Sequence, residues 1–186
     1  MKRFVCAFLV IVIGVVSVYS KSSSFNHFKL NFAPSVQQIV YDEDIYVPRV
    51  TNGITYGVAF QRSFENSSCL GAELSLAHFS YEGFYSYQDI RLSALMGWCF
   101  AEKQYSEQFG VKAFITFNVG ISVDIRDDQS TGFYPFFQLG PAVALTMENM
   151  SVEFDLDMSA SFQNGSTVMQ LSPGFSMLFP VGGNSK

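Results

Sequence analysis

Residues 111–125 read VKAFITFNVGISVDI, from Val111 to Ile125, and this stretch decides the fold. Its odd positions all carry apolar side chains, whereas its even positions carry Lys, Phe, Thr, Asn, Gly, Ser and Asp. A period of two places alternate residues on opposite faces of a β-strand, while a helix would repeat every 3.6 residues. The stretch therefore predicts a strand with one apolar face and one face of small or polar side chains.

The same alternation recurs along the chain and predicts an all-β protein. It continues in seven further segments, at about 28–32, 53–60, 69–77, 89–100, 133–145, 150–162 and 169–179. The apolar faces of these eight segments carry no Asp, Glu, Lys or Arg. Strand patterns of this length, each with a clean apolar face, predict eight antiparallel strands.

The composition fits one domain with little charge. The chain has 186 residues, of which 48% are hydrophobic, 16% aromatic and only 15% charged. A soluble domain usually has about 25% charged residues. The apolar content argues against disorder, and the net charge of −5 argues against a nucleic-acid partner.

The amino terminus has the pattern of a secretory signal peptide. Lys2 and Arg3 precede an apolar run that extends to Val18, and Ser20 offers a small residue at a cleavage site. The run is shorter than the roughly 20 residues that a membrane-spanning helix needs. We therefore expect residues 1–20 to be removed and residues 21–186 to form an exported domain.

The two faces of the strands decide between a membrane barrel and a soluble one. A soluble sandwich or lipocalin-like carrier would bury its apolar face and expose a highly charged one. Here the polar face is rich in Gly, Ser and Ala, which suits the narrow lumen of an eight-stranded barrel. Because only helices and closed barrels satisfy their backbone in lipid, the sequence predicts an eight-stranded up-and-down transmembrane β-barrel. The soluble carrier remains an alternative.

By this pattern, residues of about 25–181 resemble the small outer-membrane β-barrel proteins of the OmpX, OmpW and OmpA-barrel kind. The resemblance implies an outer-membrane location, contact with its lipid, and insertion by the outer-membrane assembly machinery. The resemblance to OmpW also implies passage of a small hydrophobic solute. Such a barrel is expected to be monomeric.

Two hairpins allow strand registers to be predicted. Asn164-Gly165 is typical of a tight hairpin turn, and it pairs Phe162 with Thr167 and Asp157 with Ser172. A second hairpin centred on Phe84 pairs Leu70 with Trp98. This second register places Cys69 opposite Cys99, which makes them candidates for a disulfide in an exported protein. The alternative is two reduced thiols.

The inward face supplies the candidate site residues. A polar network in the lumen is expected from Lys29, Glu73, Asp89, Arg91, Lys112, Asp124, Glu153, Asp155 and Asp157. Large side chains that interrupt this face are candidates to line a solute pocket, namely Leu95, Phe114, Tyr134, Phe136 and Leu178. The alternative is that these large residues only fill the lumen.

The sequence carries no signature of catalysis. P-loop, HExxH, CxxC, EF-hand and GxSxG motifs are all absent, so we expect no enzyme, cofactor or metal site. The leading interpretation is a structural or surface-interaction role. A narrow channel or transporter for small solutes is the second interpretation, as the resemblance to OmpW implies. The excess of acidic over basic residues on the lumen face would favour a narrow cation path, but the small diameter of an eight-stranded barrel argues against that path.

Overall fold

The computed structural model describes residues 25–41, 49–64, 68–81, 85–126, 129–163 and 166–181. The predicted signal peptide, residues 1–20, lies outside these ranges. The strands are β1 (Phe25–Tyr41), β2 (Arg49–Ser63), β3 (Cys69–Tyr81), β4 (Tyr85–Ser106), β5 (Phe109–Arg126), β6 (Gln129–Met147), β7 (Ser151–Gln163) and β8 (Ser166–Val181).

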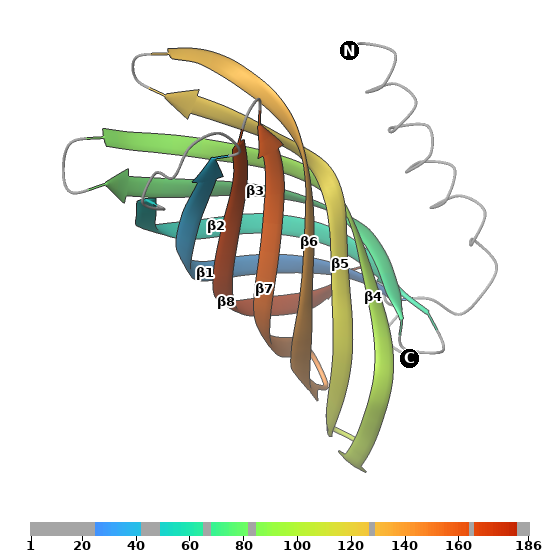
Figure 1. Ribbon diagram of the computed structural model, residues 1–186. Coiled ribbons are helices and arrows are strands. Elements are labelled where there is room, and N and C mark those ends of the chain that lie inside the picture. The colour runs from blue at the N-terminus through green and yellow to red at the C-terminus, as the bar shows by residue number, and fades with distance from the viewer. Residues whose placement is uncertain are drawn as a thin grey trace.

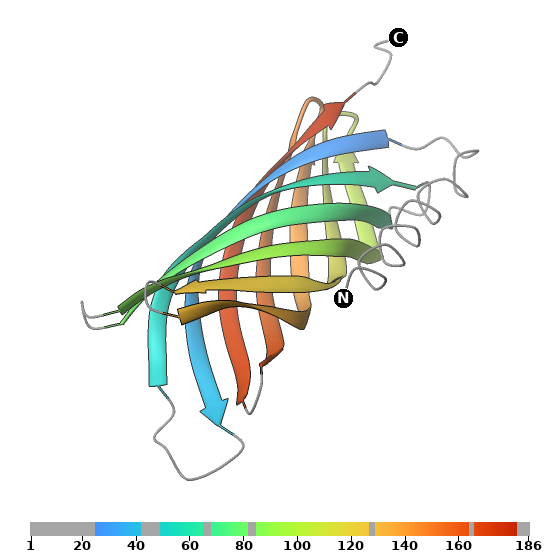
Figure 2. The ribbon, with the colours of Figure 1, turned by 90° about the horizontal axis from the view of Figure 1, so that it is seen from above.

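The eight strands form a closed barrel, as the alternation predicts. Each strand pairs antiparallel with the next one in sequence, and β8 pairs with β1 to close the sheet (Figure 1, Figure 2). Among the residues described, no helix is of a length and hydropathy that would cross a membrane. The loop end of the barrel carries the β1–β2, β3–β4, β5–β6 and β7–β8 connections. The turn end carries the other three connections and the first and last strand ends.

The register fixes the stagger of the barrel. A line drawn from strand partner to strand partner, starting at Lys29, passes once round the barrel and returns to β1 at Ile39. The stagger is therefore ten residues. An eight-stranded barrel with a stagger of eight has strands tilted by about 36°, so these strands tilt by about 40°.

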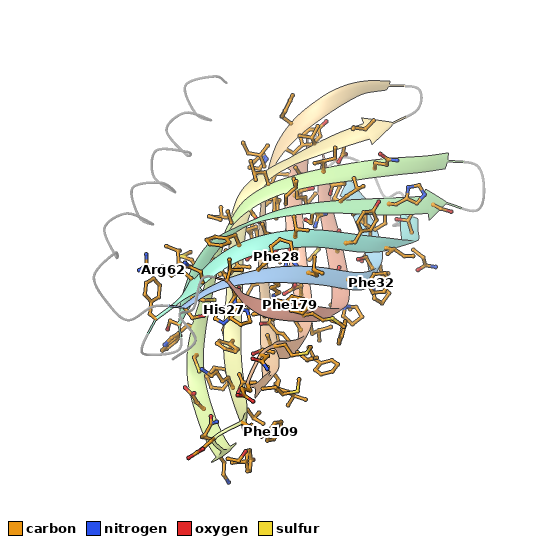
Figure 3. The ribbon with its side chains drawn as sticks, turned by 180° about the vertical axis from the view of Figure 1, so that it is seen from behind. His27, Phe28, Phe32, Arg62, Phe109 and Phe179 are labelled. Atoms are coloured by element: carbon orange, nitrogen blue, oxygen red, sulfur yellow. The ribbon has the colours of Figure 1, made fainter. Side chains whose placement is uncertain are left out.

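The apolar face of the strands is the outside of the barrel. Side chains such as Phe60, Leu74, Phe154 and Met169 are each about half exposed, whereas most of the fully buried side chains are polar. Phe28, Phe32 and Phe179 likewise project outward from β1 and β8 (Figure 3). This is the reverse of a soluble carrier, which would bury its apolar face, so the structure removes that alternative.

The apolar outer surface has the height of a bilayer core. On β2 the outward residues between Asn52 and Arg62 are Ile54, Tyr56, Val58 and Phe60. Ten residues of a strand tilted by about 40° rise about 25 Å, which is the height of the apolar band on outer-membrane barrels. At the loop end, the outer face also becomes polar at His78 and its partner Gln88. We call the surface between these polar residues the apolar belt.

The two predicted hairpin registers have different outcomes. The β7–β8 register is confirmed, because Phe162 pairs with Thr167 and Asp157 with Ser172. The β3–β4 register is wrong by two residues, because Leu70 pairs with Met96 and Cys69 pairs with Gly97. A shift of two keeps every side chain on its face, so the hydrophobic pattern cannot exclude it.

Candidate functional site: the barrel lumen

Most of the predicted network residues are buried inside the barrel. Lys29, Glu73, Asp89, Arg91, Asp124 and Glu153 are each less than a tenth exposed. Asp155 and Asp157 also point inward and are partly buried. The strand register divides these residues into two polar layers at different heights, one around Arg91 and one around Lys29.

Arg91 reaches across the lumen from β4. Its Nε donates to Asp89 Oδ2 over 2.7 Å, and its Nη2 donates to Gln170 Oε1 over 2.6 Å. Because β4 and β8 lie on opposite sides of an eight-stranded barrel, the Gln170 contact spans its full width. Nη1 donates to Ser159 Oγ on β7, and the guanidinium lies 5.2 Å from the ring centre of Phe136 on β6. One side chain thus joins four strands.

Gln170 extends this layer to β1 and β2. Its Nε2 donates to the hydroxyl oxygens of Ser172, Ser35 and Thr55, at 2.7, 3.1 and 3.2 Å. Ser35 Oγ is also within 2.9 Å of Ser172 Oγ. These neutral residues were not predicted as site residues, because Ser, Thr and Gln carry no sequence signal beyond lying on the inward face.

Further side chains pack inside the barrel on the loop side of the Arg91 layer. Ser122 on β5 hydrogen-bonds to Asp89. Phe79 is fully buried, and its ring occupies the space where a Cβ of Gly53 would stand. Only glycine at position 53 permits this close approach of the ring to the β2 backbone.

The second layer lies nearer the turn end. Lys29 Nζ lies 2.5 Å from Glu153 Oε1, which links β1 to β7, and both side chains are 6% exposed. Glu73 on β3 accepts a hydrogen bond from Asn118 Nδ2 at 3.2 Å and another from Asn31. This layer therefore connects β1, β3, β5 and β7.

A small cavity lies between the two layers. Its volume is about 40 Å³, enough for a few water molecules. Arg91 and Gln170 line it on the loop side, and Lys29 and Glu153 line it on the turn side. The lumen thus holds a small cavity with mainly polar walls between the two layers.

Lys112 and Asp124 lie away from this cavity. Lys112 Nζ is 3.1 Å from Glu102 Oε1 near the turn end, where the two side chains are 24% and 41% exposed. Lys112 is thus on the inward face but belongs to a half-exposed surface pair. Asp124 is buried near the loop end of β5, opposite Asp89 in the register.

The five large inward residues do not gather in one pocket. Only Leu95 lines the cavity. Phe136 is buried against Arg91 towards the loop end, and Tyr134 lies further along the same strand. Phe114 and Leu178 lie on the turn side, near the Lys29 layer. The walls of this cavity are mainly polar, and among the described residues the five large side chains do not line one common cavity.

Both cysteines are free thiols in the structure. Cys69 lies opposite Gly97, and its Sγ occupies the space that a Cβ at position 97 would take. Cys99 is two residues further along β4, and its Sγ donates to the carbonyl of Ala101. The expected alignment of the two cysteines is corrected by the shifted register.

The described residues contain no group of three His, Cys, Asp or Glu that would hold a metal ion. The lumen acids instead take hydrogen bonds from amides and hydroxyls or pair with Lys29 and Arg91. Chemically, these contacts satisfy polar groups inside a narrow barrel.

Comparison with known proteins supports the architecture. No known family model matches the sequence, and no curated protein matches it significantly. Among solved structures, Neisserial surface protein A matches with a TM-score of 0.53 and 10% identity, over 83% of this chain and 97% of that one. The chain has the fold of a small outer-membrane β-barrel.

Two further solved structures match less closely. The attachment invasion locus protein Ail of Yersinia pestis matches with a TM-score of 0.48 and 11% identity, over 83% of this chain and 99% of that one. The N-terminal barrel domain of Pseudomonas aeruginosa OprF matches with a TM-score of 0.39 and 13% identity, over 80% and 96%. At these identities the similarity concerns the fold alone.

Proposed function

We propose that the chain is an exported outer-membrane protein with a structural or surface-interaction role, and that it does not conduct. The polar side chains that cross the lumen carry this proposal. Arg91 and Gln170 meet across the full width of the barrel, and below them the Lys29–Glu153 pair joins β1 to β7. The outer face of such a barrel fits lipid, and polar side chains occupy most of its lumen. Its role is then to hold its loop end at the membrane surface.

The loop end offers a polar surface above the apolar belt. His78 and Ser80 on β3 and Asn52 on β2 are exposed there on the outer face. These residues lie beyond the loop-end edge of the belt, so this polar collar stands clear of the apolar layer of the lipid. We propose that the barrel is a monomer, is inserted by the outer-membrane assembly machinery, and interacts through this end.

Cysteine labelling tests the location and the orientation. Cys69 and Cys99 are replaced by Ser, and a single new cysteine is introduced as His78→Cys or, as the matched control, Arg62→Cys. The two positions lie at opposite edges of the belt. In a Gram-negative host, a membrane-impermeant maleimide should label the His78→Cys variant on intact cells. It should label the Arg62→Cys variant only after the outer membrane is opened. The reverse result would contradict the orientation, and labelling of neither in membrane fractions would contradict the location.

A narrow path for small solutes is the second candidate, and one observation favours it. The cavity is lined by four carboxylates, Glu73, Glu153, Asp155 and Asp157, but by only two cations. Swelling of vesicles that hold the refolded chain separates the two candidates. We expect no swelling in small sugars or salts with the unaltered chain, and swelling with Arg91→Ala, which removes the side chain that spans the lumen. Swelling with the unaltered chain would favour the path.

A further inference from the structure

The apolar outer surface is taller on one side of the barrel than on the other. On β5 the outward residues stay apolar from Phe109 to Ile125. Sixteen residues of a strand tilted by about 40° rise about 40 Å, compared with about 25 Å on β2. The two strands lie in the same barrel, so the apolar surface of β5 extends beyond the belt.

Most of this extension lies at the turn end. The register leads from Arg62, at the lower edge of the belt, through Leu70 and Met96 to Phe117. The stagger is ten residues over eight strands. A line of constant height round the barrel therefore falls about four residues below this row of partners over three strands, and it meets β5 at Ala113. Val111 and Phe109 therefore lie below the level of Arg62, with Phe109 about 10 Å lower.

The extension belongs to the hairpin that joins β4 and β5, and we call residues 101–112 the β4–β5 tip. Figure 3 shows Phe109 at the end of this hairpin, away from His27, Arg62 and Phe179 at other strand ends. The two faces of the tip differ. Its inner face carries Glu102 paired with Lys112, and Gln104.

The outer face of the tip carries two aromatic rings and one cation next to each other, Tyr105, Phe109 and Lys103. The rings of Tyr105 and Phe109 lie 5.8 Å apart, and Lys103 Nζ lies 4.9 Å from the centre of the Tyr105 ring. Phe109 pairs with Met147 of β6 on the same face. Tyr105 is 60% exposed and Met147 is 41% exposed. This face is continuous with the belt through Val111 and Ala113.

The edge of the tip is built to resist a strand partner. β3 ends its pairing with β4 at Cys69 and Gly97, so the described β3–β4 pairing does not reach residues 98–106 of β4. Two register irregularities interrupt this edge, at Cys99/Ala101 and Gln104/Ser106, and Glu102 and Lys103 lie between them. Bulges and charges protect an open edge against strand addition. The apolar face remains the surface that needs a partner.

We infer that the outer face of the β4–β5 tip lies in the headgroup layer of the leaflet at the turn end, with Lys103 contacting a lipid phosphate. The occupant is phospholipid because the face continues the lipid-facing belt. Tyr and Trp favour the membrane interface, and a Lys side chain extends from apolar surroundings to reach an anionic group. This inference rests on the proposed membrane location.

Indole fluorescence on the two faces of the tip tests the inference. In a Trp98→Phe background, Tyr105→Trp places an indole on the outer face, and Gln104→Trp places one on the inner face of the same strand. The full barrel is reconstituted in vesicles of phosphatidylcholine and phosphatidylglycerol, with and without brominated acyl chains. The indole at position 105 should be quenched by the brominated lipid and shielded from iodide, and the indole at position 104 should show the reverse.

Native Trp98 separates failure of this inference from failure of the proposed function. Trp98 lies on the outer face at the lower edge of the belt and is 66% exposed, so brominated lipid should quench it in the unaltered chain. If it is not quenched, the barrel is not in the membrane and both ideas fail. If Trp98 is quenched but iodide reaches the indole at position 105, the tip is in water and only the inference fails.

A charge reversal tests the contact with phosphate. Lys103→Glu in the Tyr105→Trp variant should shift the emission to longer wavelength and weaken quenching by brominated lipid, most strongly in vesicles rich in phosphatidylglycerol. An emission that does not respond to the reversal would overturn the role of Lys103. Mobility of the unboiled protein on a gel confirms that each variant has folded.

Discussion

Removal of Arg91 tests how much the Arg91 layer contributes to the stability of the barrel. Arg91→Met keeps most of the apolar stem but removes the donors to Asp89, Ser159 and Gln170. Asp89, which is 2% exposed, keeps only the hydroxyl of Ser122 among the contacts described above. Removing one partner of a buried ion pair costs about 3–5 kcal/mol, because the other charge stays buried without compensation. We expect a loss of that size in the free energy of unfolding.

Urea unfolding of the barrel in vesicles measures this loss, with Trp98 emission as the probe. Lys112→Met is the matched control, because the Lys112–Glu102 pair is half exposed and such pairs contribute about 0–1 kcal/mol. Asp89→Asn added to Arg91→Met should recover part of the stability, since the stranded charge is gone. If Arg91→Met costs no more than Lys112→Met, the reasoning about the Arg91 layer is refuted.

Two further outcomes test the belt and the corrected register. Val119→Arg, near the middle of the belt, should destabilise the barrel by about 2–4 kcal/mol, whereas Ile125→Arg at the loop end should cost about 0–1 kcal/mol. Equal losses in urea unfolding would place the belt elsewhere. For the register, Gly97→Cys combined with Cys99→Ser should form a disulfide with Cys69 under mild oxidation, seen as a reductant-dependent gel shift. The native Cys69 and Cys99 should show no such shift, and a shift in the unaltered chain would contradict the register.

The barrel and its two faces were predictable from the sequence because lipid imposes a strict pattern. A charged residue on the outer face is costly, so residues such as Phe117 and Val119 alternate without interruption with Thr116 and Asn118. That pattern fixes the strand and its orientation at once. It also fixes the parity of each register. In the β7–β8 hairpin the Asn164-Gly165 turn signal supplied the rest of the register, which is why that pairing was correct.

The parity of a register does not determine which residues pair, and the exact pairing was harder to predict. In the β3–β4 hairpin, the patterns of both strands fit equally well after a shift of two residues. The observed register places Cys69 against Gly97, where the missing Cβ leaves room for the sulfur. Packing on the inner face thus favours this register, and the alternation of apolar residues contains no information about it.

The length of β1 was underestimated because of a proline. The alternation predicts a strand over residues 28–32, but β1 continues to Tyr41 through Pro34. Pro34 pairs with Ile54 on β2, while the pairing of β1 with β8 is interrupted between Phe32 and Val36. A proline has no N–H to donate, so it is accepted where one ladder is broken.

The acidic strand β7 shows why an excess of acids on the lumen face does not by itself indicate a path for ions. The pairing of β6 with β7 is interrupted between Leu139 and Ala142, and the Asp157 carboxylate fills the space beside Gly140 there. Gln138 Nε2 donates to Asp157 over 2.6 Å, and Thr116 Oγ1 donates to the Gly140 carbonyl over 3.0 Å. Asp157 thus lies where the wall of the barrel has lost ladder hydrogen bonds.

Asp155 has the corresponding position on the other side of β7. Its carboxylate lies beside Gly174, within the stretch of β8 where the β1–β8 pairing is interrupted, and it accepts a hydrogen bond from Ser176. In a membrane, unpaired backbone groups have no water to bind, so a wall with two interruptions needs polar side chains behind it. Asp155 and Asp157 are explained by the strand breaks that they face, and Glu153 pairs with Lys29, so the excess of acids over cations does not require a path for ions.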